Sequence, residues 1–260
     1  MEKPTNGHGG IKIRNFLKRA LRPLRSFSSN FVTLVDQNSI VRKASWILSA
    51  EKVEGDYLEF GVYRGGSLIK AYSEIEAVYE EQMRESGGRS KEAALEVKRI
   101  WSEMRFFAFD SFQGLPEIAG LDAKGNDFEE GGWSSNEEVF RSNLAKSHFP
   151  MDKLVTVPGW FEKTCIEKTK EKHKMSKAAI IHIDCDLYSS AKTVLEFVED
   201  LLVDGTVLIF DDWFNFKGNP NLGEQKAFNE WSNNLSDWEF VQYQKEGPWR
   251  NSFIASYQGN

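Results

Sequence analysis

Residues 178–184 read Ala178-Ala179-Ile180-Ile181-His182-Ile183-Asp184, an apolar run that ends in an acid. Residues 105–110 and 205–211 repeat this pattern and end in Asp110 and Asp211. Near-continuous apolar runs of this length are typical of strands in a parallel sheet that is covered on both faces. They therefore predict the central strands of such a sheet.

Segments with helical spacing separate the apolar runs. This alternation predicts an α/β fold, with a doubly wound and mostly parallel seven-stranded sheet closed by an antiparallel pair. We expect an N-terminal helical extension over residues 1–50 and one α/β domain over residues 51–260. The expected strands are 56–61, 105–110, 154–157, 178–184, 205–211, 239–243 and 252–257, and the expected helices are 32–50, 67–79, 90–104, 191–202 and 223–232.

Composition narrows the class of protein. The net charge of -6 over 260 residues argues against nucleic acid as a partner. The two cysteines, Cys165 and Cys185, cannot form a disulfide framework, which favours a reducing, cytoplasmic location. No apolar run reaches the roughly 20 residues of a transmembrane helix.

The N-terminal extension is basic. Between Lys12 and Arg25, cationic residues alternate with apolar ones. The segment is either an amphipathic helix with weak contact to a membrane surface, or a solvated helix that packs on the domain or on a second subunit of a homo-oligomer.

Three aspartates are expected at one edge of the sheet. Ligands of open α/β sheets bind beyond the carboxyl ends of the strands, where Asp110, Asp184 and Asp211 would lie. One such carboxylate could simply cap the next helix. Three together favour a ligand site.

A glycine-rich turn follows the first strand, from Glu59 to Ser67. Its glycines, Gly61, Gly65 and Gly66, occupy the first, fifth and sixth places, whereas the dinucleotide pattern has the first, third and sixth. This spacing suits a loop around an amino-acid moiety, although a turn with a purely structural role would have the same sequence pattern.

Two further segments complete a candidate nucleotide pocket. Asp110, followed by Ser111, ends the second strand, where one carboxylate can accept hydrogen bonds from two ribose hydroxyls. Gly159, Trp160 and Phe161 follow the third strand. The two aromatic rings either flank an adenine or belong to the core.

Four acids follow two of the buried strands, Asp184 and Asp186 after one and Asp211 and Asp212 after the other. Neighbouring strands would bring these acids together, and close carboxylates need a cation or shared protons. Carboxylate oxygens suit a hard cation such as Mg²⁺. The alternative is two unrelated helix caps. His182 is expected to point into the core.

Five ordered motifs resemble the macrocin O-methyltransferase (TylF-type) family. They run from about Tyr57 to Trp231 and comprise residues 58–67, 109–116, 158–161, 182–188 and 211–213. The resemblance implies a class I methyltransferase fold, S-adenosylmethionine, Mg²⁺, and a sugar or phenolic hydroxyl as the acceptor, as in natural product biosynthesis.

The resemblance also implies residue roles. Asp184, Asp211 and Asp212 would bind the metal and Asp186 would be the general base. The cofactor residues would be Glu59, Gly61, Tyr63, Arg64, Gly65, Ser67, Asp110, Ser111, Gly159, Trp160 and Asp184.

Three features stand apart from the family pattern or from the motifs. The connection over residues 80–101 is longer than we expect. Trp213 stands where the family often has tyrosine, and we expect it to reshape the acceptor pocket. The glycine-bearing segment 117–133 is either a lid or a plain surface loop.

Two other functions fit parts of the sequence. Asp184-Cys185-Asp186 looks like the acid-x-acid motif of a metal-dependent glycosyltransferase, but that interpretation leaves the turn over residues 59–67 and the Asp211-Asp212 pair without roles. A non-catalytic interaction protein could also keep this fold, although we would expect it to have lost acids from the cluster.

Overall fold

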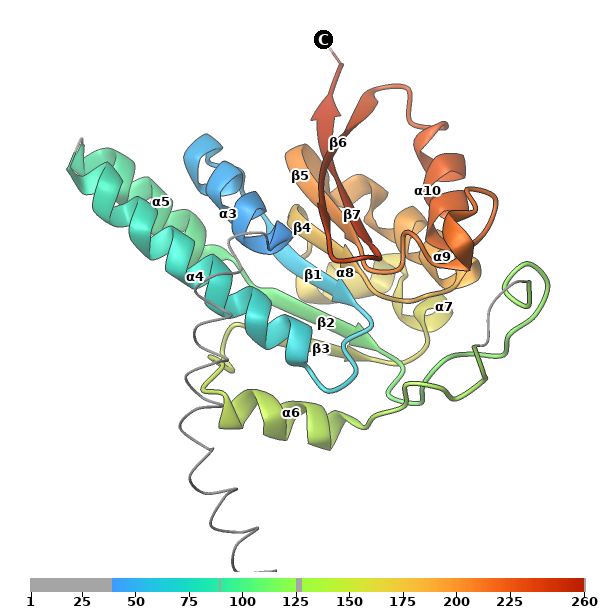
Figure 1. The fold of residues 1–260 in the computed structure, drawn as a ribbon. Coiled ribbons are helices and arrows are strands. Elements are labelled where there is room, and N and C mark those ends of the chain that lie inside the picture. Colours follow the sequence, from blue (N-terminus) through green and yellow to red (C-terminus); the bar gives the residue numbers. More distant parts are fainter. Residues whose placement is uncertain (1–38, 89, 125–127, 260) are drawn as a thin grey trace, which may run out of the picture. The chain divides into compact units, whose positions relative to one another are not determined.

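The computed structural model describes residues 39–88, 90–124 and 128–259. The chain divides into two units, Met1–Ser39 and Ile40–Asn260. The basic segment lies outside the described residues. The second unit is built on one seven-stranded sheet with the order β3-β2-β1-β4-β5-β7-β6 (Figure 1).

The sheet confirms the predicted α/β class. The first five strands pair in parallel, β7 runs antiparallel to β5, and β6 runs antiparallel to β7. The strands are β1 (Asp56–Phe60), β2 (Phe106–Asp110), β3 (Leu154–Pro158), β4 (Ala178–Ile183), β5 (Leu202–Phe210), β6 (Trp238–Glu246) and β7 (Arg250–Tyr257).

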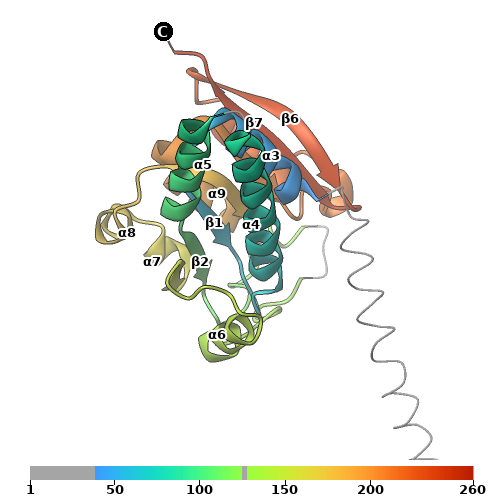
Figure 2. The same cartoon turned by 90° about the vertical axis from the view of Figure 1, so that its left-hand side faces the viewer.

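Helices cover both faces of the sheet, and α3, α4 and α5 lie side by side on one of them (Figures 1 and 2). That face carries α3 (Ile40–Glu51), α4 (Gly66–Gly87), α5 (Lys91–Glu103) and α6 (Glu137–Lys146). The other face carries α7 (Phe161–Thr164), α8 (Glu167–His173), α9 (Tyr188–Val198) and α10 (Gly223–Ser232), and two short 3₁₀ turns are η1 (Glu199–Leu201) and η2 (Phe216–Gly218).

Side chains that alternate along each strand contribute to two separate hydrophobic cores, one on each face of the sheet. In β1, Tyr57 packs with the α3–α6 face, whereas Leu58 and Phe60 pack with the α7–α10 face. Successive side chains of a strand point to opposite sides of a sheet, so a strand buried on both sides is apolar throughout. This arrangement fixes the strand ends that carry the acids.

Some predicted boundaries were wrong. The helix expected over residues 191–202 begins at Tyr188 and ends at Val198, because η1 and then β5 follow it. The long connection over residues 80–101 is the end of α4 and most of α5, which pack against each other. Helix α3, placed with the N-terminal extension by sequence, buries Ile40 and Leu48 in the core of this unit; the division at residue 50 stays a prediction.

None of the helices within the described ranges is long and apolar enough to cross a membrane.

Candidate active site

A cavity of about 550 Å³ opens at the carboxyl ends of the parallel strands. Its size falls within the usual range for small-molecule sites. Its walls combine the turn after β1, the end of β2, the segment after β3 and the acids after β4 and β5. The predicted site residues on these walls are Gly61, Tyr63, Arg64, Ser67, Asp110, Ser111, Trp160, Asp184, Asp186, Asp211 and Asp212.

Backbone hydrogen bonds hold the strand ends together beneath the cavity. The amide of Asp184 donates to Phe60 O and that of Asp211 donates to Ile183 O, each at 2.9 Å. Gly61 has φ +91°, and a Cβ built there would lie 1.8 Å from the carbonyl oxygen of Asp184. A side chain at this position would therefore force β1 and β4 apart.

Asp110 clamps the glycine-rich turn to the end of β2. Its Oδ2 accepts from the amides of Val62 (2.8 Å) and Tyr63 (2.9 Å), and its Oδ1 accepts from the amide of Phe112 (2.7 Å). Two carboxylate oxygens offer about four acceptor sites, so capacity remains for a ligand hydroxyl. The carboxylate thus shapes the turn as well as facing the cavity.

Three predicted cofactor residues form no part of the described cavity wall. Glu59 is fully buried behind it and accepts a hydrogen bond from Ser67 Oγ at 2.5 Å. Gly65 has φ +84° and faces α6, where a Cβ would lie 2.4 Å from Leu144 Cδ1. Gly159 donates its amide to Asp110 O at 2.8 Å. Their positions indicate that they support the wall, and their binding roles stay predictions.

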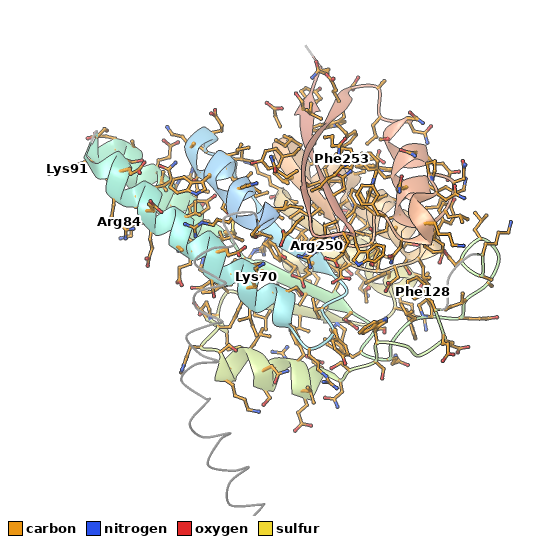
Figure 3. The ribbon with its side chains drawn as sticks, viewed as in Figure 1. Lys70, Arg84, Lys91, Phe128, Arg250 and Phe253 are labelled. Atoms are coloured by element: carbon orange, nitrogen blue, oxygen red, sulfur yellow. The ribbon has the colours of Figure 1, made fainter. Side chains whose placement is uncertain are left out.

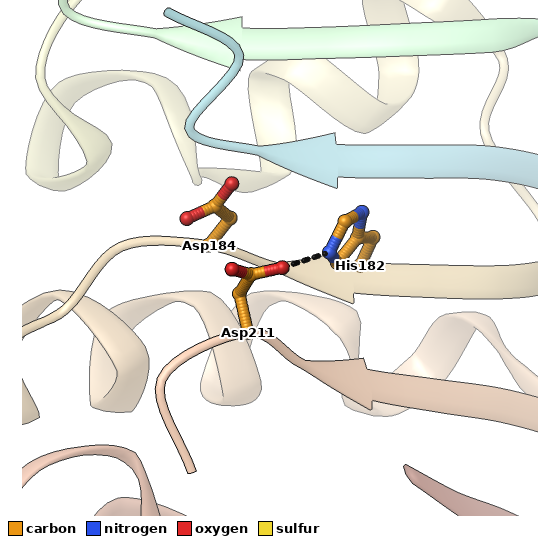
Figure 4. Close-up of side chains that lie close together, drawn as sticks. All are labelled: His182, Asp184 and Asp211. Carbon is orange, nitrogen blue, oxygen red and sulfur yellow. Dashed lines mark hydrogen bonds and ion pairs between the residues drawn. The ribbon is translucent and has the colours of Figure 1, made fainter. Parts of the chain in front are cut away.

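Two of the acids predicted to bind a metal, Asp184 and Asp211, converge as the sequence indicated, whereas the third, Asp212, lies outside the group of side chains that could share one ion. Single ligand atoms of Asp184, Asp211 and His182 lie within 4.8 Å of one another (Figure 4). Burial, followed by repulsion from Asp211, raises the pKa of Asp184 well above its usual value. Burial and the nearby charge of Asp186 raise the pKa of Asp212 to about 8, and burial raises that of Asp186 to about 6.

Asp211 differs from the other acids because its pKa is not raised, and two hydrogen-bond donors contact its carboxylate. His182 Nε2 lies 3.2 Å from its Oδ1, and Arg250 Nε contacts the same oxygen. Burial alone would raise the pKa of Asp211, but these partners keep it below its usual value. Arg250 is the first residue of β7, on the same strand as the core residue Phe253 (Figure 3).

His182 supports Asp211 from behind, and it also belongs to the group of described side chains that could hold a metal ion. The Tyr57 hydroxyl donates to Glu59 Oε2 at 2.6 Å, so its oxygen is free to accept from His182 Nδ1 at 3.1 Å. The other ring nitrogen faces the Asp211 carboxylate. Burial alone would lower the pKa of His182, but hydrogen bonds to Asp211 and Glu59 raise it to about 10. A protonated imidazole has no lone pair for a metal.

Glu224, at the start of α10, is a fifth acid that the sequence analysis missed. Its Oε2 accepts from the amide of Asp212 at 3.0 Å. Its Oε1 and Asp212 Oδ2 are buried and have no hydrogen-bond partner within the described residues. Unpaired buried carboxylate oxygens are costly. The donor set consists entirely of carboxylate oxygens, which fits a hard divalent cation.

Arg250 and its neighbour Trp249, which lines the cavity, were likewise not predicted from the sequence. The register of the sheet explains their place. Phe210, the last residue of β5, pairs with Asn251 of the antiparallel β7, so the start of β7 lies beside the end of β5. An antiparallel strand therefore brings its first residues to the ligand edge.

The loop between β2 and α6 covers one side of the cavity. Its ends are joined by two backbone hydrogen bonds of 2.9 Å between Leu115 and residues 131 and 132. Asp122 anchors the middle of the loop, because its carboxylate accepts from the amides of Tyr188 (2.7 Å) and Ser189 (3.2 Å) at the start of α9. Whether the loop moves as a lid stays a prediction.

The expectation for Trp213 was wrong. Its side chain is buried and packs against the rings of Phe210, Phe228 and Phe253, with centroid distances of 5.0, 5.4 and 4.9 Å. It belongs to the core beneath the acids rather than to the cavity.

Comparison with known proteins identifies the family. The macrocin-O-methyltransferase (TylF) family matches residues 90–235, which is more than half of the chain. The chain belongs to this family. The family resemblance is thereby confirmed, and the match covers four of the five motifs, including the acids after β4 and β5; residues 58–67 precede it.

Two relatives have named activities. A tetracenomycin 4'-O-methyltransferase from Streptomyces olivaceus, named for an 8-(2,3-dimethoxy-α-L-rhamnosyl) substrate, is 31% identical over 63% of this chain. The mycinamicin III 3''-O-methyltransferase from Micromonospora griseorubida is 28% identical over 62%. The matches cover 55% and 56% of those proteins, so this chain spans about half the length of the relatives it matches.

Solved structures support the fold. The crystal structure of CalS11, a calicheamicin methyltransferase, covers 96% of this chain and is itself covered to 94%, with a TM-score of 0.59 and 18% identity. Together with the sheet order, this confirms the expected class I methyltransferase fold for this chain.

Proposed function

We propose that this chain is an S-adenosylmethionine- and Mg²⁺-dependent O-methyltransferase that acts on a sugar hydroxyl of a glycosylated small molecule. The observation that carries the proposal is one cavity that joins a glycine-rich turn and a ribose-side carboxylate to a cluster of five acids. The family and the names of its two relatives support the choice of methyl donor and of acceptor.

The donor would lie along the turn after β1. Ser67 and Gly61 would contact its methionine end, Asp110 its ribose, and Trp160 its adenine. Gly61 lets the backbone of this turn pass directly over the end of β4. The sulfonium would then lie beside the acids, whose negative charge favours a cationic donor.

Asp184, Asp211 and Asp212 would hold the cation, whose charge would lower the pKa of the acceptor hydroxyl when bound. Asp211 is already fixed by His182 and Arg250 through its Oδ1, which leaves Oδ2 available. Asp212 contributes the buried, unpaired Oδ2. The Asp212 carboxylate also accepts a hydrogen bond from Asn215 Nδ2 through its Oδ1, so hydrogen bonds orient the side chains of both Asp211 and Asp212.

Asp186 would remove the proton from the acceptor hydroxyl. Burial raises its pKa to about 6, which leaves it ionised at neutral pH yet basic enough to accept a proton. The acceptor oxygen would then attack the methyl carbon in line with the departing thioether sulfur.

Exposed aromatic rings at the mouth of the cavity would receive the acceptor. Tyr63, Trp133 and Trp249 are 36%, 68% and 52% exposed, and all three line the cavity. The rings of Tyr63 and Trp133 meet edge to face, with centroids 6.1 Å apart. Large exposed rings around a polar centre suit a ligand with apolar faces and hydroxyl edges, such as a glycoside.

The test is methyl transfer by the full chain from labelled S-adenosylmethionine to aryl rhamnosides, with the matching free phenols as a second panel. We expect Mg²⁺-dependent labelling of the sugars, lost in Asp184→Ala and reduced at least a hundredfold in Asp186→Asn. Asp152→Ala, which changes an exposed acid away from the cavity, is the control. Full activity in Asp184→Ala would remove the metal from the reaction.

A panel of nucleotide-sugars as donors covers the glycosyltransferase alternative. Binding of a nucleotide-sugar in place of S-adenosylhomocysteine would overturn the proposal. If the chain binds neither donor, the non-catalytic interpretation gains support.

A further inference from the structure

A chain of buried side chains runs behind the cavity wall and connects the glycine-rich turn with the acid cluster. Ser67 Oγ donates to Glu59 Oε1 at 2.5 Å, and the Tyr57 hydroxyl donates to Glu59 Oε2 at 2.6 Å. His182 then bridges the Tyr57 hydroxyl (3.1 Å) and Asp211 Oδ1 (3.2 Å). These five residues form what we call the buried chain.

The sheet itself sets this path. Glu59 and His182 are register partners on β1 and β4, and Asp211 follows the end of β5. Tyr57 and Glu59 are fully buried and His182 is 3% exposed, so water cannot replace the links among these three residues. Ser67 and Asp211, at the two ends, are partly buried and line the cavity. Hydrogen bonds in such surroundings are strong, and a missing partner is costly.

We propose that Tyr57 is a positioning residue that couples the methyl-donor turn to the metal acids, so that donor and cation each tighten the binding of the other. The inference rests on the proposed function, because Ser67 and Asp211 are its donor and metal residues. Tyr57 itself does not line the cavity.

The physical reason is shared restraint of the two ends. Ser67 and Asp211 are partly buried and line the cavity, so they keep freedom that the three residues between them have already lost. A donor that contacts Ser67 restrains one end and a cation on Asp211 restrains the other. Because hydrogen bonds join the two ends, the ligand that binds first reduces the freedom that the second must remove. Thermodynamic linkage requires the effect to be equal in both directions.

The protein provides a matched control for removing one buried hydroxyl. Tyr79 is also fully buried, but its hydroxyl has no hydrogen-bond partner within the described residues. Tyr79→Phe therefore removes a tyrosine oxygen from the same domain without breaking the buried chain. Tyr57→Phe removes the hydroxyl that joins Glu59 to His182 and leaves these two residues only their direct contact of 3.7 Å between Oε2 and Nδ1.

Calorimetry on the full-length protein tests the coupling at one fixed pH. S-adenosylhomocysteine is titrated with and without saturating Mg²⁺, and Mg²⁺ with and without S-adenosylhomocysteine. We expect each ligand to lower the Kd of the other about tenfold, within the usual range of coupling. The ratio of the Kd measured without the other ligand to the Kd measured with it should fall to within about twofold of unity in Tyr57→Phe. In Tyr79→Phe this ratio should stay at its wild-type value.

The outcomes separate the two proposals. A wild-type protein that binds both ligands without coupling, or a Tyr57→Phe variant that keeps the ratio, overturns the role of Tyr57. A wild-type protein that binds neither ligand contradicts the proposed function instead. If Tyr57→Phe does not fold, Glu59→Gln interrupts the next link and should lower the ratio in the same way; a retained ratio there also overturns the inference.

Discussion

Gly61 is the residue on which the geometry of the cavity floor depends. A Cβ at this position would meet the backbone oxygen of Asp184 at 1.8 Å, and φ is +91°. We expect Gly61→Ala to lower the free energy of unfolding by about 3 kcal/mol, from steric overlap and backbone strain together. Urea unfolding measures this.

Gly66→Ala is the matched control, because a Cβ there meets no described atom within 4 Å and the residue begins α4. Its unfolding free energy should stay within about 1 kcal/mol of the wild type. Equal stability of the two variants would contradict the close approach of the turn to β4.

Among the elements, the loop of residues 117–133 is joined to α9 by the buried side chain of Asp122. Asp122 is 4% exposed and accepts from two amides at the start of α9, which has no capping side chain of its own. Asp122→Ala should lower stability by about 1 kcal/mol, as the loss of a helix cap does, and should expose the loop to proteases.

Thermal unfolding and limited proteolysis measure these two effects. Glu117→Ala, in an exposed part of the same loop, should change neither. If Asp122→Ala were cleaved no faster than the wild type, the loop would be held by contacts other than this cap.

The strands show where reasoning from sequence succeeds. The apolar runs before Asp184 and Asp211 predicted β4 and β5 because strands buried on both faces carry an unambiguous pattern. Contacts made by residues distant in sequence have no such local signal. Arg250 lies 39 residues from Asp211, and only the antiparallel register of β7 brings them together.

Single residues were harder still to assign from sequence. Glu59 falls in a cofactor motif, yet it supports Ser67 from behind the wall. Trp213 follows two site acids, yet the next turn of the chain directs it into the core. The position of a residue in a motif predicts that it lies near the site. The direction of its side chain depends on packing that sequence spacing does not encode.

For the molecule as a whole, the acid cluster links stability to pH. Asp212 has an ordinary pKa of 3.8 and a folded-state pKa of about 8. The folded, cation-free protein therefore holds a proton that the unfolded chain has released. Stability from this group is complete below about pH 4 and is lost as pH rises toward 8. Asp186 acts in the same direction up to about pH 6.

We therefore expect the free energy of unfolding, measured with urea in EDTA, to fall between about pH 5 and pH 8. Mg²⁺ should restore more stability at the higher pH, because the cation competes with the protons. Asp212→Asn should flatten the dependence. A wild-type profile that rises over this interval would contradict the burial of these acids as a group.

The most direct measurement is anomalous diffraction from crystals of the full-length protein grown with S-adenosylhomocysteine and Mn²⁺ as a stand-in for Mg²⁺. We predict a single strong anomalous peak at about 2 Å from oxygens of Asp184, Asp211 and Asp212, with the nucleoside against Asp110 in the same cavity. Nucleoside density in the cavity with no anomalous signal among these aspartates would contradict the account of one shared donor and metal site.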